Sequence, residues 1–364
     1  MNRRTVLTGG GLAVLTAAVV STASYLRLGS AKDYDLAMTN LRSPLPVQAE
    51  LKDIIRFATL AANSHNTQPW RFGLSDNRID ILPDFFRRTP AVDPDDHHLF
   101  VSLGCAAENL ALAAGNRGRP GELRFDAAAE GSIVYEFTTG AGRASELFDT
   151  ISKRQSTRAE YDGKPVSAPD LARLASTASV DGVDVIFITE RTQIDKIRDL
   201  ILAANTDQLV DKVFVKELKN WLRFNPSQAL TSGDGLYSAT SGNPALPTWA
   251  GPLMFDLMVR PKSENDKYAR QLNSSAGIVV FVAAKEDHEH WVRVGQACQR
   301  FALQATALGL KHAFINQPVE VAQFRPELAA LIGAPSQRPD ILMRFGYGAA
   351  LPYSARRPVE AVIV

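Results

Sequence analysis

Two short segments of this chain carry side chains that could bind a polar ligand. In the first, Arg154, Ser156 and Arg158 occupy alternate positions, so an extended backbone would project two guanidinium groups and a hydroxyl to the same side. Guanidinium groups bind phosphate through paired hydrogen bonds, and a nearby cation stabilises negative charge on a reduced heterocycle. The segment therefore predicts a site for an anionic, oxygen-rich group. A solvated charged turn is the simpler alternative for these five residues.

The second segment contains two side-chain amides, Asn66 and Gln68, directly before Pro69 and Trp70. An amide both donates and accepts hydrogen bonds, so the pair could contact the carbonyl and hydroxyl groups of a ligand. The alternative is a capping loop that places Trp70 in the core.

The histidine and cysteine residues are not expected to form a metal site. Asp95–His98 and His288–His290 could supply ligands in principle. We expect the adjacent histidines of the first segment to be solvated in an Asp-rich turn, and those of the second lie where a helix begins, so they do not share a face. Cys105 and Cys298 are expected to be small apolar core residues, with a buried redox role as the less favoured alternative.

Composition excludes several classes of protein. The 364 residues include 40 basic and 39 acidic side chains, a net charge of +1, with no basic block in the body of the chain, so a nucleic-acid partner is not expected. Two cysteines cannot form a disulfide framework. No Walker loop and no G-x-S-x-G elbow occurs, and Gly9–Gly11 does not follow a strand, which disfavours a Rossmann dehydrogenase and an α/β-hydrolase.

The N-terminus resembles a twin-arginine export signal. Arg3 and Arg4 precede an uncharged apolar stretch from Gly9 to Val20. The resemblance implies that residues 1–31 are read by the twin-arginine translocase and that the protein is periplasmic or in the cell envelope. The run from Val6 to Ala23 is near the lower length limit for a membrane span, so an uncleaved anchor is the alternative.

Hydrophobic periodicity predicts an α+β protein without a regular βαβ alternation. The least regular segment, 223–248, is rich in Gly, Ser, Asn and Pro and is expected to be a surface excursion or lid. The expected helices lie near 47–62, 99–114, 169–178, 193–221 and 291–308, with another ending at 151–154, and the expected strands are 70–74, 78–82, 133–137, 185–188, 278–282 and 341–345.

The two long apolar helices show a weak internal repeat. Small and apolar residues match at a constant separation of 191 positions. Chance and a duplicated module both explain this match. The paired positions are Gly104 with Gly295, Ala106 with Ala297, Leu110 with Phe301, and Gly118 with Gly309.

Three segments together resemble the nitroreductase superfamily of FMN-binding proteins. The stretch 62–70 is similar to its P-S-x-x-N-x-Q-P-W signature, 154–158 to its R-x-S-x-R motif, and 346–358 to its C-terminal basic segment. In the ordinary family R-x-S-x-R comes first, whereas here it follows the Asn66 segment. The reversed order and the lid-like segment most resemble the Acg-type branch. The resemblance implies a nitroreductase-like fold built as a single-chain pseudodimer of two degenerate repeats, 32–150 and 151–364.

The same resemblance implies roles for particular residues. Arg154 and Ser156 would bind the FMN phosphate or ribityl chain, and Arg158 would lie near the pyrimidine edge of the ring. The further residues implied are Arg356 and Arg357 at the phosphate, Ser64, Asn66 and Gln68 from the other half, and the backbone near Asn316 and Gln317 at the flavin N5. Ala62 stands where the family often has proline, which leaves that loop less constrained.

The expected function is that of an FMN-dependent oxidoreductase, which passes hydride from NAD(P)H through the flavin to a nitro, quinone or related acceptor. No metal is implied. A flavin-sequestering protein is the alternative, because the 223–248 segment could close over the ring. An exported ligand-binding module without flavin is a more remote one.

Overall fold

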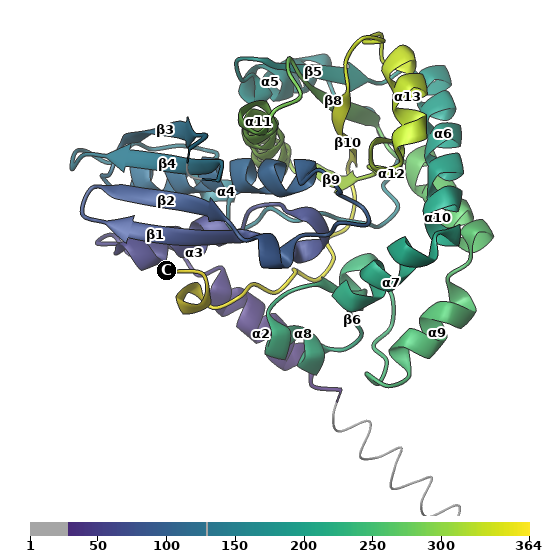
Figure 1. Cartoon of the computed structure of the whole chain (residues 1–364), viewed down its shortest axis with the longest axis horizontal. Coiled ribbons are helices and arrows are strands. Elements are labelled where there is room, and N and C mark those ends of the chain that lie inside the picture. Colours follow the sequence, from purple (N-terminus) through teal and green to yellow (C-terminus); the bar gives the residue numbers. More distant parts are fainter. Residues whose placement is uncertain (1–27, 129) are drawn as a thin grey trace, which may run out of the picture.

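The computed structural model describes residues 28–128 and 130–364, so the predicted export signal lies almost wholly outside the described residues. Two four-stranded antiparallel sheets flank a pair of long helices, α4 and α11 (Figure 1). The elements of the first half are α2 (Ala31–Leu41), α3 (Leu51–Thr59), η1 (Ser64–Asn66), β1 (Trp70–Ser75), β2 (Arg78–Pro83), α4 (His97–Asn116), β3 (Gly121–Asp126) and β4 (Ser132–Phe137).

The second half is longer because several helices stand between its first two strands. Its elements are α5 (Ala168–Ala178), β5 (Val183–Ile188), α6 (Arg191–Val210), α7 (Lys212–Trp221), α8 (Pro226–Ser232), α9 (Gly251–Met258), α10 (Pro261–Asn273), β8 (Gly277–Ala283), α11 (His288–Ala307), β9 (Lys311–Phe314), α12 (Gln317–Glu320), α13 (Arg325–Leu331) and β10 (Pro339–Gly346). The α+β class and most of the expected elements are confirmed. Sequence analysis missed β3 and β9.

The two sheets share one topology. The first has the strand order β1-β2-β4-β3 and the second β5-β8-β10-β9, and every neighbouring pair is antiparallel. In each sheet the long helix, α4 or α11, connects the second strand to the third. The C-terminal tail then returns to the first half, where Val364 donates a backbone hydrogen bond to Phe72 of β1 over 3.0 Å.

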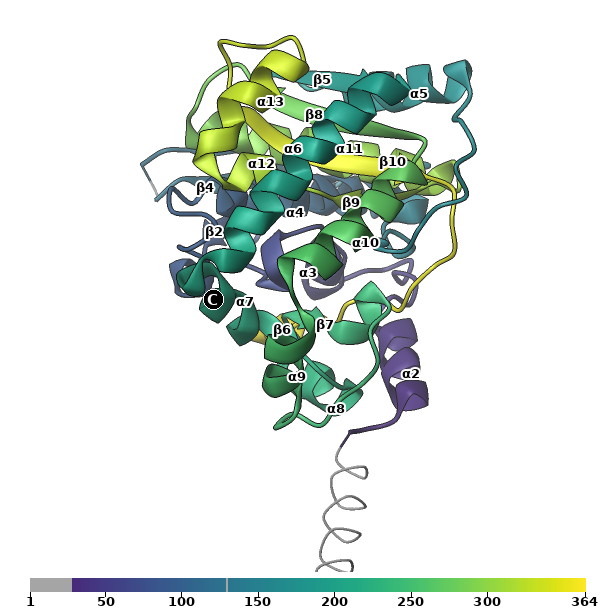
Figure 2. The same ribbon diagram turned by 90° about the vertical axis from the view of Figure 1, so that its right-hand side faces the viewer.

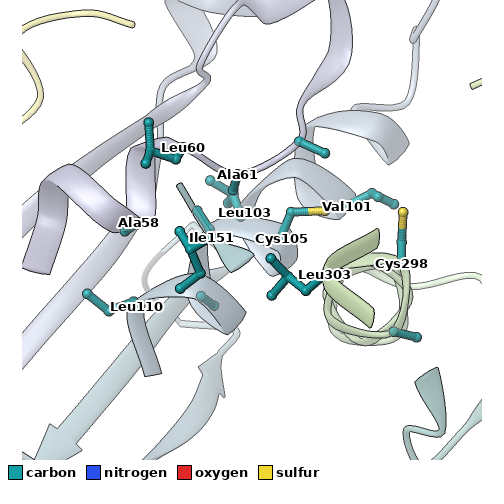
Figure 3. Packing of buried hydrophobic residues seen from close by; sticks show 14 of the residues in the cluster. Ala58, Leu60, Ala61, Val101, Leu103, Cys105, Leu110, Ile151, Cys298 and Leu303 are labelled. Carbon is teal, nitrogen blue, oxygen red and sulfur yellow. The ribbon is translucent and has the colours of Figure 1, made fainter. Parts of the chain in front are cut away.

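The centre of the molecule is the contact between α4 and α11. Gly104 and Gly295 let the two backbones approach closely: a Cβ added to either glycine would lie 2.0 Å from a carbonyl oxygen of the other helix. Cys105 and Cys298 are buried among the aliphatic side chains of this contact, as expected (Figure 3). Helix α4 has the length and the mean hydropathy, 1.2, of a membrane span, but 83% of that stretch is buried inside the protein, so α4 is a core helix.

The segment 223–248 is more ordered than the sequence predicts. It contains α8 and the two-residue strands β6 (Leu222–Arg223) and β7 (Leu236–Tyr237), which pair in parallel. Helix α8 packs against α2 at one end of the molecule, and Figure 2 shows both elements there. Tyr34 and Met38 of α2, Ala229, Tyr237 and Ala355 of the tail form a separate small core.

Two local expectations are wrong. The helix expected to end at 151–154 is only one turn of 3-10 helix, Phe148–Thr150, because the chain leaves it to run beside β9, where the N–H of Thr157 donates to the carbonyl of His312 over 2.8 Å. His97 and His98 are not solvated: they are 1% and 5% exposed. Asp93 accepts from the backbone N–H groups of His98 and Leu99 and so starts α4 within the core rather than at the surface.

Candidate functional site

A pocket with a strongly basic wall lies where both halves and the tail meet. It encloses about 450 Å³ of space between atoms, its open mouth included. Among the residues that the structure describes, four arginines and no carboxylate line it, so its potential favours an anion. The lining residues are Arg42, Ala62, Asn63, Asn66, Arg154, Gln155, Ser156, Arg158, Leu236, Pro352, Ser354 and Arg356.

The extended run at 154–158 forms one side of this pocket. Ser156 forms a parallel β-bridge with His312 of β9, and this bridge keeps the backbone extended. On the opposite side of the run, the Thr157 hydroxyl donates to Gln155 Oε1 over 3.1 Å. The alternating arrangement predicted from the sequence therefore forms, and Arg154, Ser156 and Arg158 all line the pocket.

Arg154 has hydrogen-bonding capacity that the described protein does not use. The side chain is 4% exposed, and its Nη2 donates to the carbonyl of Leu60 over 3.2 Å. Its Nε and Nη1 are buried and have no partner among the described residues. Burial lowers the pKa of this guanidinium below its ordinary value. A buried cation with unpaired donors is costly, and an anion in the pocket would remove much of that cost.

Arg356 faces the same pocket with its donors already paired. Its Nε and Nη2 donate to the carbonyls of Thr59, Leu60 and Ala61 at the end of α3, and its Nη1 donates to Asn66 Oδ1 over 2.9 Å. A cation at a helix C-terminus satisfies free carbonyls and interacts favourably with the helix dipole. Arg356 therefore anchors α3 and contributes charge to the pocket without a free donor.

The two predicted amides, Asn66 and Gln68, hold their loop to other parts of the protein by hydrogen bonds. We call these two side chains the clasp. Asn66 Nδ2 donates to the carbonyls of Gly235 and Ala355 over 3.0 and 3.1 Å. Gln68 Nε2 donates to the carbonyl of Gly233 over 2.9 Å, and its Oε1 accepts from the N–H of Arg357 over 2.9 Å. Their side chains are thus occupied in joining the inserted helices and the tail to this loop. Gln68 does not line the pocket.

The loop that carries these amides has an unusual backbone. His65, Asn66 and Gln68 have φ values of 47°, 55° and 53°, in the left-handed region that residues other than glycine seldom adopt. The clasp hydrogen bonds and the bond from the Gln68 N–H to Asn63 Oδ1, at 2.9 Å, hold this conformation.

His65 shares the electrostatic environment of the pocket, although it is not one of the lining residues. Burial and the nearby guanidinium of Arg158 lower its pKa to about 4, so its ring is neutral near pH 7. Its Nδ1 is buried without a partner among the described residues.

The remaining predicted residues lie outside the pocket. Ser64 is in η1, and its N–H donates to Ser102 Oγ over 3.3 Å. Arg357 Nη2 donates to the carbonyl of Ala361 over 2.6 Å. Asn316 Oδ1 accepts from the N–H of Leu342 over 2.8 Å, and Gln317 is buried at the start of α12. None of these four lines the pocket.

One lining residue had no sequence signal. Arg42 follows α2 directly and belongs to no motif. Its guanidinium stacks 4.1 Å from the ring centre of Tyr353, and its Nη2 donates to the carbonyl of Ser354 over 3.3 Å. Burial and the nearby Arg154 lower its pKa to about 10. Only the packing of α2 against the tail brings it to the pocket.

The chain is similar to several known proteins. A protein of Mycobacterium tuberculosis strain H37Rv, provisionally named an NAD(P)H nitroreductase, is 24% identical over 338 residues, which cover 89% of this chain and 93% of that protein. Another from the same strain, provisionally named NAD(P)H nitroreductase acg, is 24% identical over 86% of this chain and 94% of its own length.

Among solved structures, a nitroreductase with bound FMN from Desulfitobacterium hafniense is 15% identical, covers 59% of this chain and 96% of its own, and has a TM-score of 0.37. The FMN-dependent nitroreductase NfnB of Mycobacterium smegmatis, in complex with NADPH, is 13% identical, covers 60% and 92%, and has a TM-score of 0.38. The model of the nitroreductase family matches residues 151–347, more than half of the chain. This chain belongs to the nitroreductase family.

Proposed function

We propose that this protein binds FMN in the basic pocket and acts as an FMN-dependent NAD(P)H oxidoreductase. The donors of the buried Arg154 that have no partner in the described part of the chain carry the proposal, together with the four arginines that line the pocket there without a carboxylate. The phosphate of FMN is an anion that accepts several hydrogen bonds, and a buried guanidinium with free N–H groups fits it.

Arg154, Ser156 and Arg42 are the residues proposed to hold the phosphate and ribityl chain, and Arg158 is proposed to lie nearer the ring. Bound FMN would supply hydride transfer between NAD(P)H and a nitro, quinone or related acceptor. The protein's part is to orient the cofactor and to place cationic charge beside it. Arg158 does the latter, since a fixed guanidinium favours an anionic form of the reduced flavin.

The test begins with the cofactor of the purified protein. Released by denaturation and identified by mass, it should be FMN at one equivalent per chain. Anaerobic titration with NADPH and NADH should then bleach the visible flavin absorbance, and adding a quinone should restore it. A colourless protein that does not bind added FMN would refute the binding proposal, and a spectrum that stays oxidised would refute the activity.

Flavin sequestration is the second candidate function. The ion pairs that fasten the inserted segment 223–248 to the rest of the protein favour it. Asp234 forms ion pairs with Arg87 of the first half and with Arg223, and Leu236 of the same segment lines the pocket. A segment fastened in this way restricts the approach of a nicotinamide to the flavin.

A variant that weakens the attachment of the segment 223–248 distinguishes the oxidoreductase from the flavin-sequestering protein. If the segment limits access, Asp234→Asn should raise the rate of flavin reduction by NADPH at least tenfold while one FMN remains bound per chain. Asp256→Asn, which removes an exposed ion pair with Lys219 in the same insertion, is the matched control. An unchanged rate in Asp234→Asn would exclude the access-limiting role.

We also propose that the two halves are repeats of one unit related by an approximate two-fold axis. The contacts between α4 and α11 are reciprocal at the separation of 191 positions noted above. Glu108 accepts from Arg300 over 2.9 Å, and Gln299 donates to Asn109 over 2.8 Å. At a separation of 191 positions Glu108 corresponds to Gln299 and Asn109 corresponds to Arg300, so the two hydrogen bonds are equivalent contacts. Two-fold interfaces show this reciprocity, and the shared strand order of the two sheets supports it.

The same proposal accounts for the reversed motif order, because one chain then supplies both sides of a site that lies between two subunits in the ordinary family. Export by the twin-arginine translocase and a periplasmic or cell-envelope location remain proposals from the sequence of residues 1–31.

A further inference from the structure

A stripe of exposed apolar side chains runs along α9. Trp249, Leu253, Leu257 and Met258 are 66%, 64%, 65% and 62% exposed. The first three are four residues apart, so they follow one face from the turn before the helix to its last turn. Four large apolar side chains within ten residues form a concentrated surface feature of the kind that marks an interaction site. We call these four residues the α9 stripe.

The stripe faces outward because the other side of α9 is fixed to the protein. Gly251 lies against the ring of Phe224, so closely that an added Cβ would lie 2.2 Å from it. Lys219 of α7 pairs with Asp256 and lies 5.5 Å from the ring centre of Phe255. The helix therefore cannot bury the stripe by rotating without breaking these contacts.

The stripe is at the end of the molecule where the described chain begins. Figures 1 and 2, two views related by rotation about the vertical axis, both place α8, α9 and the start of α2 at the lower end. The carbonyl of Leu28 accepts from the N–H of Ser227 in α8 over 2.9 Å, which fixes the start of the described chain to the same insertion that contains α9.

The sequence before Leu28 limits how far this end can be from a membrane. The apolar run Val6–Ala23 ends five positions before Leu28. Five extended residues reach roughly 17 Å. In the uncleaved chain with that run in a bilayer, Leu28 therefore lies within roughly 17 Å of the apolar layer, and Ser227 of α8 is hydrogen-bonded to it.

The side chains next to the stripe suit a lipid surface. Arg260 and Lys262 follow α9 directly and are exposed, as is Lys216 on α7. Tryptophan is the residue most typical of the membrane interface, and flanking basic residues interact favourably with anionic headgroups.

We propose that the α9 stripe inserts into the interfacial layer of a lipid bilayer and orients this protein on the membrane. The N-terminal run supplies attachment, and the stripe supplies a second, weaker contact that fixes which end of the molecule faces the lipid. A stripe of this size with adjacent basic residues resembles the apolar face of an interfacial helix.

Tryptophan fluorescence tests this directly, because Trp249 is the one exposed tryptophan of the four in the chain. The full-length protein is reconstituted into vesicles of phosphatidylcholine and phosphatidylglycerol, with and without brominated acyl chains. Brominated lipid should quench the emission, and Trp249→Phe should remove at least half of that quenching. Equal quenching in both proteins would overturn the proposal, since attachment through the N-terminal run alone leaves Trp249 in water.

A matched pair of variants separates insertion from general hydrophobicity. Leu253→Ser combined with Leu257→Ser should reduce the quenching of Trp249 at least threefold. Val364→Ser, which changes an equally exposed residue on the edge of the first sheet, should leave it unchanged. The proposal also fails if the lipid-free protein in detergent shows Trp249 shielded from iodide in a concentration-dependent manner, because a second copy would then cover the stripe. All these readouts are independent of flavin content and activity.

Discussion

Replacing Arg154 with methionine should have opposite effects on the empty and the loaded protein. Arg154 is 4% exposed and its guanidinium makes one hydrogen bond, while Nε and Nη1 have no partner among the described residues. Unpaired buried donors cost about 1–3 kcal/mol, and the lost bond to Leu60 contributes about 1 kcal/mol. Arg154→Met should therefore leave the free energy of unfolding of the apoprotein unchanged or raise it by up to about 2 kcal/mol.

The same substitution should weaken FMN binding strongly. Two hydrogen bonds from a guanidinium to a phosphate, at a minimum of about 1.5 kcal/mol each, contribute about 3 kcal/mol. The Kd for FMN should therefore rise about 150-fold. Fluorescence titration of the apoprotein with FMN measures the Kd, and urea unfolding monitored by circular dichroism measures the stability.

Arg356→Met is the control within the same pocket. Its guanidinium is fully paired with the end of α3 and with Asn66, so its removal leaves several buried acceptors unsatisfied. The free energy of unfolding of the apoprotein should fall by about 3–5 kcal/mol. If Arg154→Met destabilises the apoprotein as much as Arg356→Met does and changes the Kd less than threefold, then Arg154 is structural and our assignment of the phosphate site is wrong.

Three further substitutions test the fold and the loop. Gly295→Ala should lower the free energy of unfolding by about 3 kcal/mol or more, because the new Cβ would lie 2.0 Å from the carbonyl oxygen of Val101; a loss below 1 kcal/mol in urea unfolding would contradict the close contact of α4 and α11. Gln68→Leu should destabilise the apoprotein by about 3 kcal/mol because it leaves the Gly233 carbonyl without its donor, whereas a purely ligand-binding amide would change only the Kd for FMN. His65→Asn keeps a residue that tolerates a left-handed backbone and removes a ring whose pKa is lowered to about 4. Because the unfolded chain binds the proton more readily, the wild type should lose about 2–3 kcal/mol relative to this variant as the pH falls from about 6.5 to about 4, and parallel stability curves over that window would refute the low pKa.

Local sequence patterns predicted those parts of the site whose geometry depends on neighbours in the chain. Arg154, Ser156 and Arg158 line one pocket because an extended backbone alternates its side chains, and this needs only a few residues of strand-like structure. The turn at Asp76–Asn77 and the strands β1 and β2 around it are predictable for the same reason. The long helices α4 and α11 have an unmistakable apolar composition, although it did not reveal that His97 and His98 lie within the core.

Contacts between distant segments could not be predicted in this way. Asn66 and Gln68 look like ligand-binding amides in isolation, but their partners Ala355, Gly235 and Gly233 are 289, 169 and 165 positions away. Arg42 reaches the pocket only through the packing of α2 against the tail. No local pattern encodes such partners, because they depend on how the chain returns to the loop after more than a hundred residues.

The two halves contribute different segments to the site because the connections between their corresponding elements differ in length. In the first half, the connection from α3 to β1 is the long loop Leu60–Pro69, which carries the clasp. In the second half, the corresponding connection from α5 to β5 is only Ser179–Gly182, too short to form such a loop. Conversely, β1 and β2 are joined by a two-residue turn, whereas β5 and β8 are joined by the inserted helices that return Gly233 and Gly235 to the clasp.

If the halves are repeats, each has therefore kept a different part of the original unit. The first half kept the loop, and the second kept the Arg154 segment and acquired the insertion that closes on that loop. A second, equivalent pocket would need the loop on the second half and an R-x-S-x-R segment before the first, and the described chain has neither. One chain can thus complete one such pocket, where the loop of the first half meets the insertion and the tail of the second half.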